Sequence, residues 1–145
     1  MLDDLYREIL RDHARAPHHW GTLQQADVTV TGESPVCGDT ITLQLCFSGG
    51  KVAQVGFHGS GCTISLASAS ILTDMIMDRA VETLPKLIDA AEELLRGTAS
   101  PDNSLGDLAA LSGVARYPTR VRCALLAWKA LRRALDDYTG MQTIA

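Results

Sequence analysis

Two neighbouring stretches of strict period-two alternation constrain the fold more than any other feature of the chain. In residues 40–47 every second side chain is apolar, and residues 51–58 repeat this pattern after a Ser-Gly-Gly link at 48–50. Such alternation is typical of a strand with one buried face, and a short glycine-rich link predicts an antiparallel hairpin. Residues 28–31 alternate in the same way. The sequence therefore predicts a small antiparallel sheet with one apolar face to cover.

The rest of the chain has mostly helical periodicity. The expected helices span residues 3–15, 62–78, 83–97, 105–114 and 118–138. In the first of them, Leu5, Ile9 and His13 recur at helical spacing, and Pro17 and Gly21 follow its end. Because one helix is followed by strands and then by further helices, we expect an α+β fold. Its helices should pack on one face of the sheet, in a single domain over residues 1–145.

Size and charge narrow the possible functions. The chain has 145 residues and a net charge of −4, which argues against a nucleic-acid-binding surface. No apolar run reaches the roughly 18 residues of a membrane-spanning helix, and the acidic start lacks the apolar segment of a signal peptide. We therefore expect a cytoplasmic protein that binds neither nucleic acid nor a membrane. In that compartment its four cysteines should be metal ligands or reactive thiols rather than disulfides.

Three cysteines lie where chemistry is plausible. Cys37 comes just before a predicted strand, Cys62 between a glycine-rich turn and a helix, and Cys123 in the first turns of the last helix. A helix N-terminus favours the thiolate form. Gly38 gives the backbone freedom to turn Cys37 and Asp39 toward one centre. Three thiolates and one carboxylate suffice for a tetrahedral Zn²⁺ site or for iron. However, their spacings match no CxxC pair, so cysteines that only fill a core stay an alternative.

The other cysteine and the histidines favour ordinary structural roles. Cys46 lies in the middle of a strand, and we expect no chemical role for it. His13, His18 and His19 lie in and after the first helix, far in sequence from the thiols. His58 is the best histidine candidate for a ligand, but its place at a strand end favours a surface position.

Three segments together resemble a known family. They are SPVCGD at 34–39, HGSGCTISLASASILTD at 58–74 and LGDLAALSGVARYPTRVRCALLAWKAL at 105–131. They resemble the SufU branch of the U-type iron–sulfur cluster assembly proteins (the SufU, IscU and NifU N-terminal-like family), and the resemblance covers essentially the whole chain. It implies a three-stranded antiparallel sheet with helices. It also implies a metal site formed by Cys37, Asp39, Cys62 and Cys123, which in SufU-type proteins typically holds Zn²⁺, with iron or an iron–sulfur cluster as the alternative.

The resemblance further implies partners and a reaction. The expected partner is a SufS-like, pyridoxal-phosphate-dependent cysteine desulfurase, from which this protein takes persulfide sulfur and passes it toward downstream iron–sulfur assembly proteins. We expect Cys37 to be the reacting thiol, because it lies on a loop beside Gly38, whereas Cys62 and Cys123 are anchored on helices. A histidine of the desulfurase is expected to take the zinc position that Cys37 leaves. The protein would be a sulfurtransferase-like partner, not a stand-alone enzyme.

Other functions stay open. A cluster could be assembled on the same four ligands, as on a scaffold; here Arg122 stands where the IscU branch has a histidine, and arginine does not ligate metals. Zinc could be a purely structural element of an interaction domain, or the thiols could form a dithiol redox centre. Arg120, one helical turn before Cys123, could pair with Asp39 or be solvated.

Overall fold

The computed structural model describes residues 2–35, 38–100 and 103–144. Its elements in chain order are α1 (Leu2–Arg15), β1 (Val28–Glu33), β2 (Thr40–Ser48), β3 (Lys51–Ser60), α2 (Thr63–Ile76), η1 (Val81–Thr83), α3 (Leu84–Arg96), η2 (Asn103–Arg116) and α4 (Pro118–Ile144). The α+β class and the antiparallel sheet predicted from the sequence are confirmed. None of the described helices is long and apolar enough to cross a membrane.

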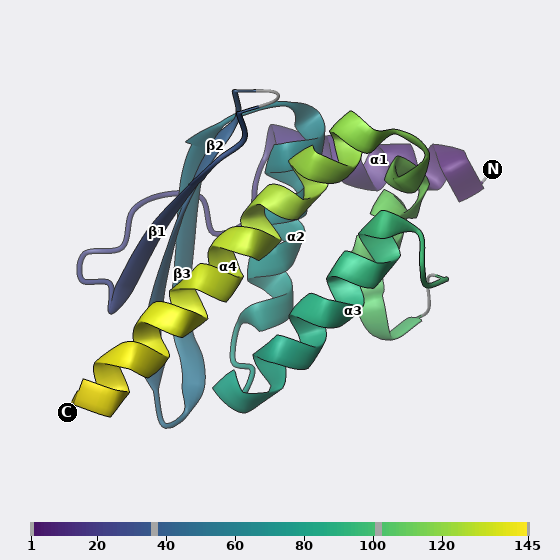
Figure 1. The fold of residues 1–145 in the computed structure, drawn as a ribbon. Helices are drawn as coiled ribbons and strands as arrows, with labels where there is room; N and C mark the ends of the chain where they lie inside the picture. Colours follow the sequence, from purple (N-terminus) through teal and green to yellow (C-terminus); the bar gives the residue numbers. More distant parts are fainter. Residues whose placement is uncertain (1, 36–37, 101–102, 145) are drawn as a thin grey trace.

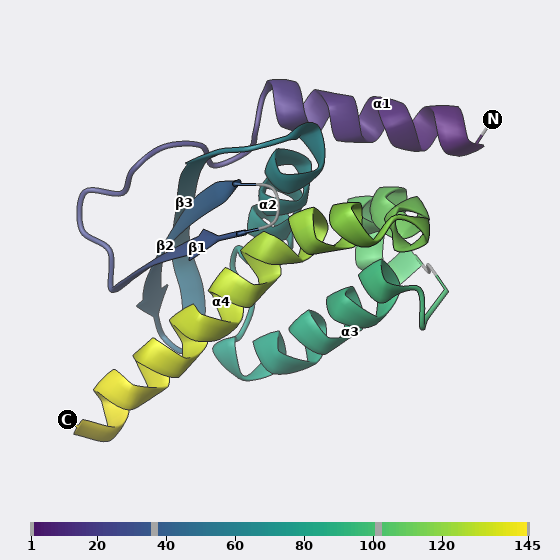
Figure 2. The same cartoon turned by 45° about the horizontal axis from the view of Figure 1, so that its top comes forward.

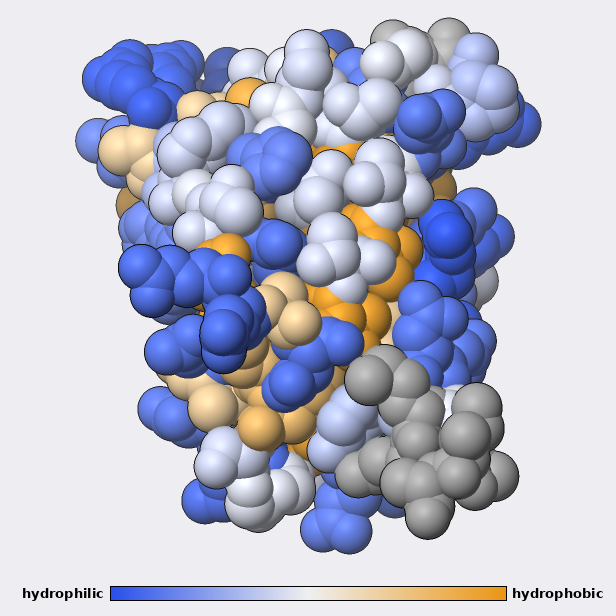
Figure 3. Space-filling model, turned by 90° about the vertical axis from the view of Figure 1, so that its left-hand side faces the viewer, coloured by the Kyte–Doolittle hydropathy of each residue, from blue (hydrophilic) through white to orange (hydrophobic). Residues whose placement is uncertain are grey.

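The sheet has three antiparallel strands in the order β1-β2-β3. Burial alternates along β1 and β2 as the sequence pattern predicts, and Ile41, Leu43 and Leu45 are completely buried on the inner face. On the outer face the hydroxyls of Thr31 and Thr42 form a cross-strand hydrogen bond of 2.9 Å. Figure 3 shows this side of the molecule, with pale and blue side chains over much of it and a narrower hydrophobic area between them.

The helices form two further layers behind the inner face of the sheet. The long helix α4 and the central helix α2 lie against the strands, and α3 and η2 lie behind them (Figures 1 and 2). The buried side chains of all three layers belong to one hydrophobic cluster. Between the two helical layers, Arg132 of α4 donates hydrogen bonds to Asp89 and Glu92 of α3. The bond to Asp89 raises the pKa of Arg132.

The helix α1 buries only part of the face expected for it. It lies across the top of α2 and η2 in Figure 2. Leu5, expected in the core, is 51% exposed, while the neighbouring Leu10 packs against the core. His13, in contrast, is buried. The helix meets its neighbours mainly along its C-terminal half, so only apolar positions in that half are covered.

The short helix expected over 105–114 lies within η2, and it is a 3₁₀-helix. Its large buried apolar residues recur at every third position, namely Leu105, Leu108, Leu111 and Val114, and the small Ala110 is buried as well. A 3₁₀-helix has three residues per turn, so this spacing aligns them on one side, which an α-helix would not do. The period of three is therefore a sequence signal for the observed structure. Gly106, with φ of 53° and ψ of −133°, interrupts the segment near its start.

Candidate metal centre

A tight turn between β1 and β2 supplies the first part of the site. The Ser34 amide donates to the Asp39 carbonyl at 2.9 Å, and the Gly38 amide donates to the Ser34 carbonyl at 2.8 Å. Gly38 has a φ of 75°, in the left-handed region where glycine is favoured. This φ agrees with the backbone freedom expected of Gly38, while Cys37, which Gly38 was expected to orient together with Asp39, lies outside the described residues. The turn places Asp39 beside the end of β3, where Thr40 pairs with Ser60.

The start of α2 supplies the second part. Cys62 is the N-cap residue of α2, and its amide donates to Asp39 Oδ2 at 3.3 Å. The Ser65 hydroxyl donates to the same oxygen at 2.5 Å and lies 3.5 Å from Cys62 Sγ. The carboxylate of Asp39 is thus the anion at this helix N-terminus, where unpaired N–H groups and the helix dipole favour it. A Cβ at Gly61 would lie 3.0 Å from the Asp39 carboxyl carbon, so glycine leaves the room that this approach needs.

The third part comes from α4, far along the chain. Cys123, buried on the first turns of that helix, faces the same space. A carboxylate oxygen of Asp39 and the sulfurs of Cys62 and Cys123 lie within 4.8 Å of one another. The fourth residue of the expected set, Cys37, lies outside the described residues. Three elements that are distant in sequence therefore bring one oxygen and two sulfur donors together.

An open cavity of about 660 Å³ leads to these donors. Besides the three donors, its wall includes Arg7 and Arg11 of α1 and Arg120 of α4. The guanidinium carbon of Arg120 lies 4.7 Å from the centre of the Tyr117 ring, a cation–π contact. The site thus has thiols at its base and positive charge at its rim.

The donor set fits the metal expected from the sequence. Cysteine sulfur and carboxylate oxygen are both ligands that Zn²⁺ takes in tetrahedral sites, and thiolates also suit iron. Asp39 and Cys123 are buried and Cys62 is exposed, so a ligand held here would be open to partners on one side.

Two other candidates lie away from this centre. The thiol of Cys46 donates to the Gln25 carbonyl at 2.8 Å on the outer side of the sheet. His58 is exposed on β3 and is not among the described groups of potential metal ligands. Both positions agree with the structural roles that the sequence favours for them.

The described fold and site can be compared with known proteins. The sequence pattern of the family described as "NifU-like N terminal domain" matches residues 5–145. The chain belongs to this family.

Two relatives with different described functions are about equally similar to this chain. It is 38% identical over 142 residues to the iron–sulfur cluster assembly scaffold protein IscU of Streptococcus pyogenes, covering 97% of this chain and 89% of the relative. It is also 38% identical over 140 residues to the zinc-dependent sulfurtransferase SufU of Bacillus subtilis, covering 96% and 95%. Sequence identity therefore does not show whether this chain is more similar to the assembly scaffold or to the sulfurtransferase.

A solved structure supports the same fold. The crystal structure of a protein named as an iron–sulfur cluster assembly scaffold for the SUF system, from Fervidobacterium islandicum, superposes with a TM-score of 0.83 at 33% identity. The match covers 88% of this chain and 94% of the other. The resemblance read from the sequence, to the SufU, IscU and NifU N-terminal-like family, is confirmed.

Sequence reasoning missed two features of the structure. The first is Ser65, which holds the Asp39 carboxylate from the first turn of α2; a serine three residues after Cys62 gives no specific signal for this contact. The second is a separate convergence of His13 and His18 with Asp74. His13 and His18 are close in sequence, but Asp74 lies far along the chain, so the spacing of the three carries no local signal.

Proposed function

We propose that this protein works in iron–sulfur cluster assembly as a zinc-dependent sulfur acceptor for a cysteine desulfurase. The observation that carries the proposal is the convergence of Asp39, Cys62 and Cys123 at the base of one open cavity. Membership of the NifU-like family and the similarity to a zinc-dependent sulfurtransferase support it. In the proposal Zn²⁺ is held by these three residues and Cys37, and when bound it keeps the thiols deprotonated.

The chain's own residues have distinct parts in this proposal. Ser65 and the Cys62 amide orient the Asp39 carboxylate, and α2 and α4 anchor Cys62 and Cys123. Cys37, next to the left-handed Gly38, is the thiolate that reacts. Asp39 is the one oxygen donor among sulfur donors and is the ligand most readily exchanged.

The proposed transfer is a thiol–disulfide type of exchange. The Cys37 thiolate attacks the outer sulfur of the persulfide on the desulfurase. A new S–S bond forms at Cys37, the S–S bond of the original persulfide breaks, and the desulfurase cysteine leaves as a thiolate. No oxidant or reductant is consumed. The arginine-lined rim, with Arg7, Arg11 and Arg120, attracts a partner that carries negative charge near its reacting sulfur.

The test is cysteine-dependent sulfide release by a SufS-like desulfurase, in a reductant, without and with this protein in its zinc form. We expect a stimulation of tenfold or more that Cys37→Ala abolishes while bound zinc is still detected by metal analysis. Cys46→Ala is the matched control, because Cys46 lies on the outer side of the sheet, and it should stimulate as the wild type does. If the folded, zinc-loaded wild type gives no stimulation, the transfer function is wrong.

A second candidate function is that of a scaffold for cluster assembly. The equally high identity to a protein named as an assembly scaffold favours it, and the same thiolates can ligate iron. Anaerobic reconstitution with Fe²⁺ and sulfide distinguishes the two. A brown, cluster-loaded protein that transfers its cluster to an apo-ferredoxin would support the scaffold function. A protein that stays colourless and delivers no cluster would oppose it.

A further inference from the structure

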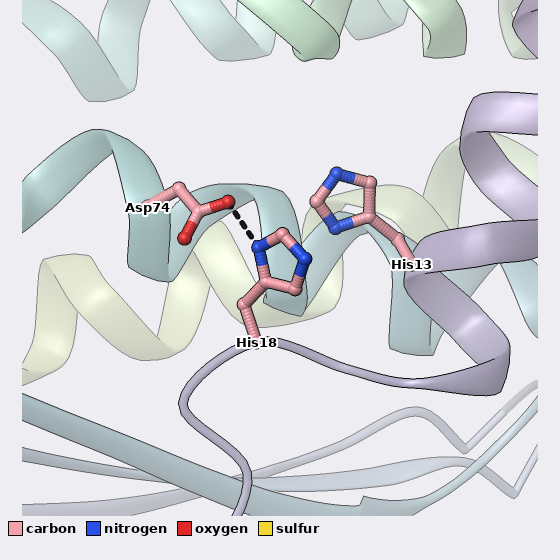
Figure 4. Close-up of side chains that lie close together, drawn as sticks. All are labelled: His13, His18 and Asp74. Carbon is pink, nitrogen blue, oxygen red and sulfur yellow. Dashed lines mark hydrogen bonds and ion pairs between the residues drawn. The ribbon is translucent and has the colours of Figure 1, made fainter.

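A second group of potential metal ligands lies near the C-terminal end of α2. Nitrogens of His13 and His18 and a carboxylate oxygen of Asp74 lie within 4.8 Å of one another. Figure 4 shows the three side chains meeting from the end of α1, the segment after it and α2. Asp74 follows Cys62 by twelve residues, or about 18 Å of helix at 1.5 Å per residue. The group is therefore separate from the thiol centre.

The hydrogen bonds of His13 leave its Nδ1 without a proton. Ser70 Oγ accepts the His18 amide at 2.8 Å, so its own proton is available for His13 Nδ1 at 2.7 Å. His13 Nε2 then carries the proton and donates to Asp107 Oδ2 at 2.9 Å. A carboxylate that holds the outer N–H of a histidine, with the other nitrogen facing inward, is the usual second-shell support of a metal-bound imidazole. A metal ion that binds His13 Nδ1 has to displace the Ser70 hydroxyl from this nitrogen.

Asp74 gathers further imidazoles around the same point. His18 Nδ1 lies 2.5 Å from Asp74 Oδ2, and His19 Nδ1 lies 3.5 Å from Asp74 Oδ1. Two consecutive residues reach one carboxylate because His19 has a φ of 59°, which turns its side chain back toward α2. Hydrogen bonds between His19, Gly21 and Phe57 of β3 fix this turn in place.

The charge of the group also favours a cation. Within the described residues, the ion pairs of Asp74 and Asp107 are with histidines only. With neutral imidazoles the two carboxylates carry a charge of −2, which a divalent cation balances. His13 is buried, while His18 and Asp74 are partly exposed, at 52% and 39% of their side-chain surface. An ion would therefore have a fixed ligand on one side and access from solvent on the other.

We propose that His13, His18 and Asp74, flanked by His19, form a second metal site for a divalent transition metal such as Zn²⁺ or Fe²⁺. Two imidazole nitrogens and one carboxylate oxygen are a donor set that these ions take, with water in the remaining positions. The proposal is independent of the function of the thiol centre.

The test uses Co²⁺ as the metal, added to protein whose thiol centre has first been filled with Zn²⁺. We expect equilibrium dialysis to give one further equivalent of Co²⁺, with weak visible absorption and without the intense near-ultraviolet bands of cobalt–thiolate bonds. His18→Ala and Asp74→Asn should lose this equivalent. Asp107→Asn should weaken binding about 10- to 100-fold, as loss of a second-shell partner does. His58→Ala, which removes a histidine outside the group, should bind as the wild type does.

Two outcomes would overturn the site. One is a wild type that takes up no further Co²⁺. The other is a further equivalent that persists in both His18→Ala and Asp74→Asn; both variants alter partly exposed side chains, so their folding is not at risk. In either case the histidines only join α1 to α2 by hydrogen bonds. Cobalt–thiolate bands in the Zn²⁺-loaded protein would instead report a failure of the thiol centre to hold zinc.

Discussion

The Ser65 hydroxyl and the Cys62 amide hold the same oxygen of Asp39, at 2.5 and 3.3 Å. These two hydrogen bonds fix the orientation of the Asp39 carboxylate, and so also the position of its other oxygen. Neither contact could be predicted from residue types, because serine at this spacing is common at helix starts. The three residues that meet here, Asp39, Cys62 and Cys123, could be named from the family resemblance, whereas their spacing alone left a core role open.

Replacement of Ser65 by alanine should therefore weaken zinc binding without unfolding the protein. Loss of one hydrogen bond to a ligand typically lowers metal affinity about 10- to 100-fold. Competition with a chromophoric chelator measures the change. Ser112→Ala, at a half-exposed position on η2, is the control. Equal affinities for wild type and Ser65→Ala would show that Asp39 does not act as a ligand or that its orientation is unimportant.

Gly59, on β3, tests how tightly the sheet is packed beside the centre. A Cβ there would lie 2.2 Å from the Thr40 carbonyl oxygen and 3.1 Å from the Ile41 Cα, so the backbone has to shift. We expect Gly59→Ala to lower the free energy of unfolding by about 1–3 kcal/mol, as overpacking does. Urea unfolding measures this. Gly113→Ala meets no atom within 4 Å and should change stability little; a similar loss in both would mean that strand packing is not the cause.

At the level of elements, the contact between α2 and α4 depends on one buried hydroxyl. Ser68 Oγ donates to the Ala124 carbonyl at 2.6 Å and accepts the indole N–H of Trp128 at 3.2 Å. All three residues are completely buried. This contact positions Cys123, which precedes Ala124 on the same helix, against the start of α2.

Ser68→Ala removes the partner of a buried indole N–H. An unsatisfied buried donor costs about 1–3 kcal/mol, so we expect a loss of that size in urea unfolding. Zinc affinity should fall as well, because Cys123 is then held less firmly. A variant as stable as the wild type would mean that the Trp128 N–H finds another acceptor.

The sequence identifies elements to different degrees. The three strands could be predicted because alternation of Ile41, Leu43 and Leu45 has no other common explanation. A short helix was expected over 105–114, but its 3₁₀ type was not, since a period of three lies close to 3.6 over only a few turns. The burial of His13 agrees with its place on the expected face of α1, but its partners Ser70 and Asp107 could not be predicted, because only the tertiary fold brings them near.

For the molecule as a whole, the hydrophobic cluster spans the sheet and the helix layers. A core of this extent does not need a metal to fold. If zinc were a purely structural element, the protein would instead unfold when the metal is removed.

Removal of metal with a chelator should leave the far-ultraviolet circular dichroism unchanged and lower the Tm by only several degrees. The reason is that the metal stabilises the folded state by mass action and does not create it. Thermal unfolding with and without chelator measures the shift. Loss of the folded signal at room temperature would show that zinc is a structural requirement, and the transfer proposal would lose its main support.

The order of the ligands along the chain has a consequence for synthesis. A ribosome releases Asp39 and Cys62 well before Cys123, and η1, α3 and η2 all come between them. A growing chain that ends before α4 has the sheet and α2 but lacks the third donor and the Ser68–Ala124 contact that positions it. In the proposed metal site, capture by the complete donor set therefore waits until α4 has docked.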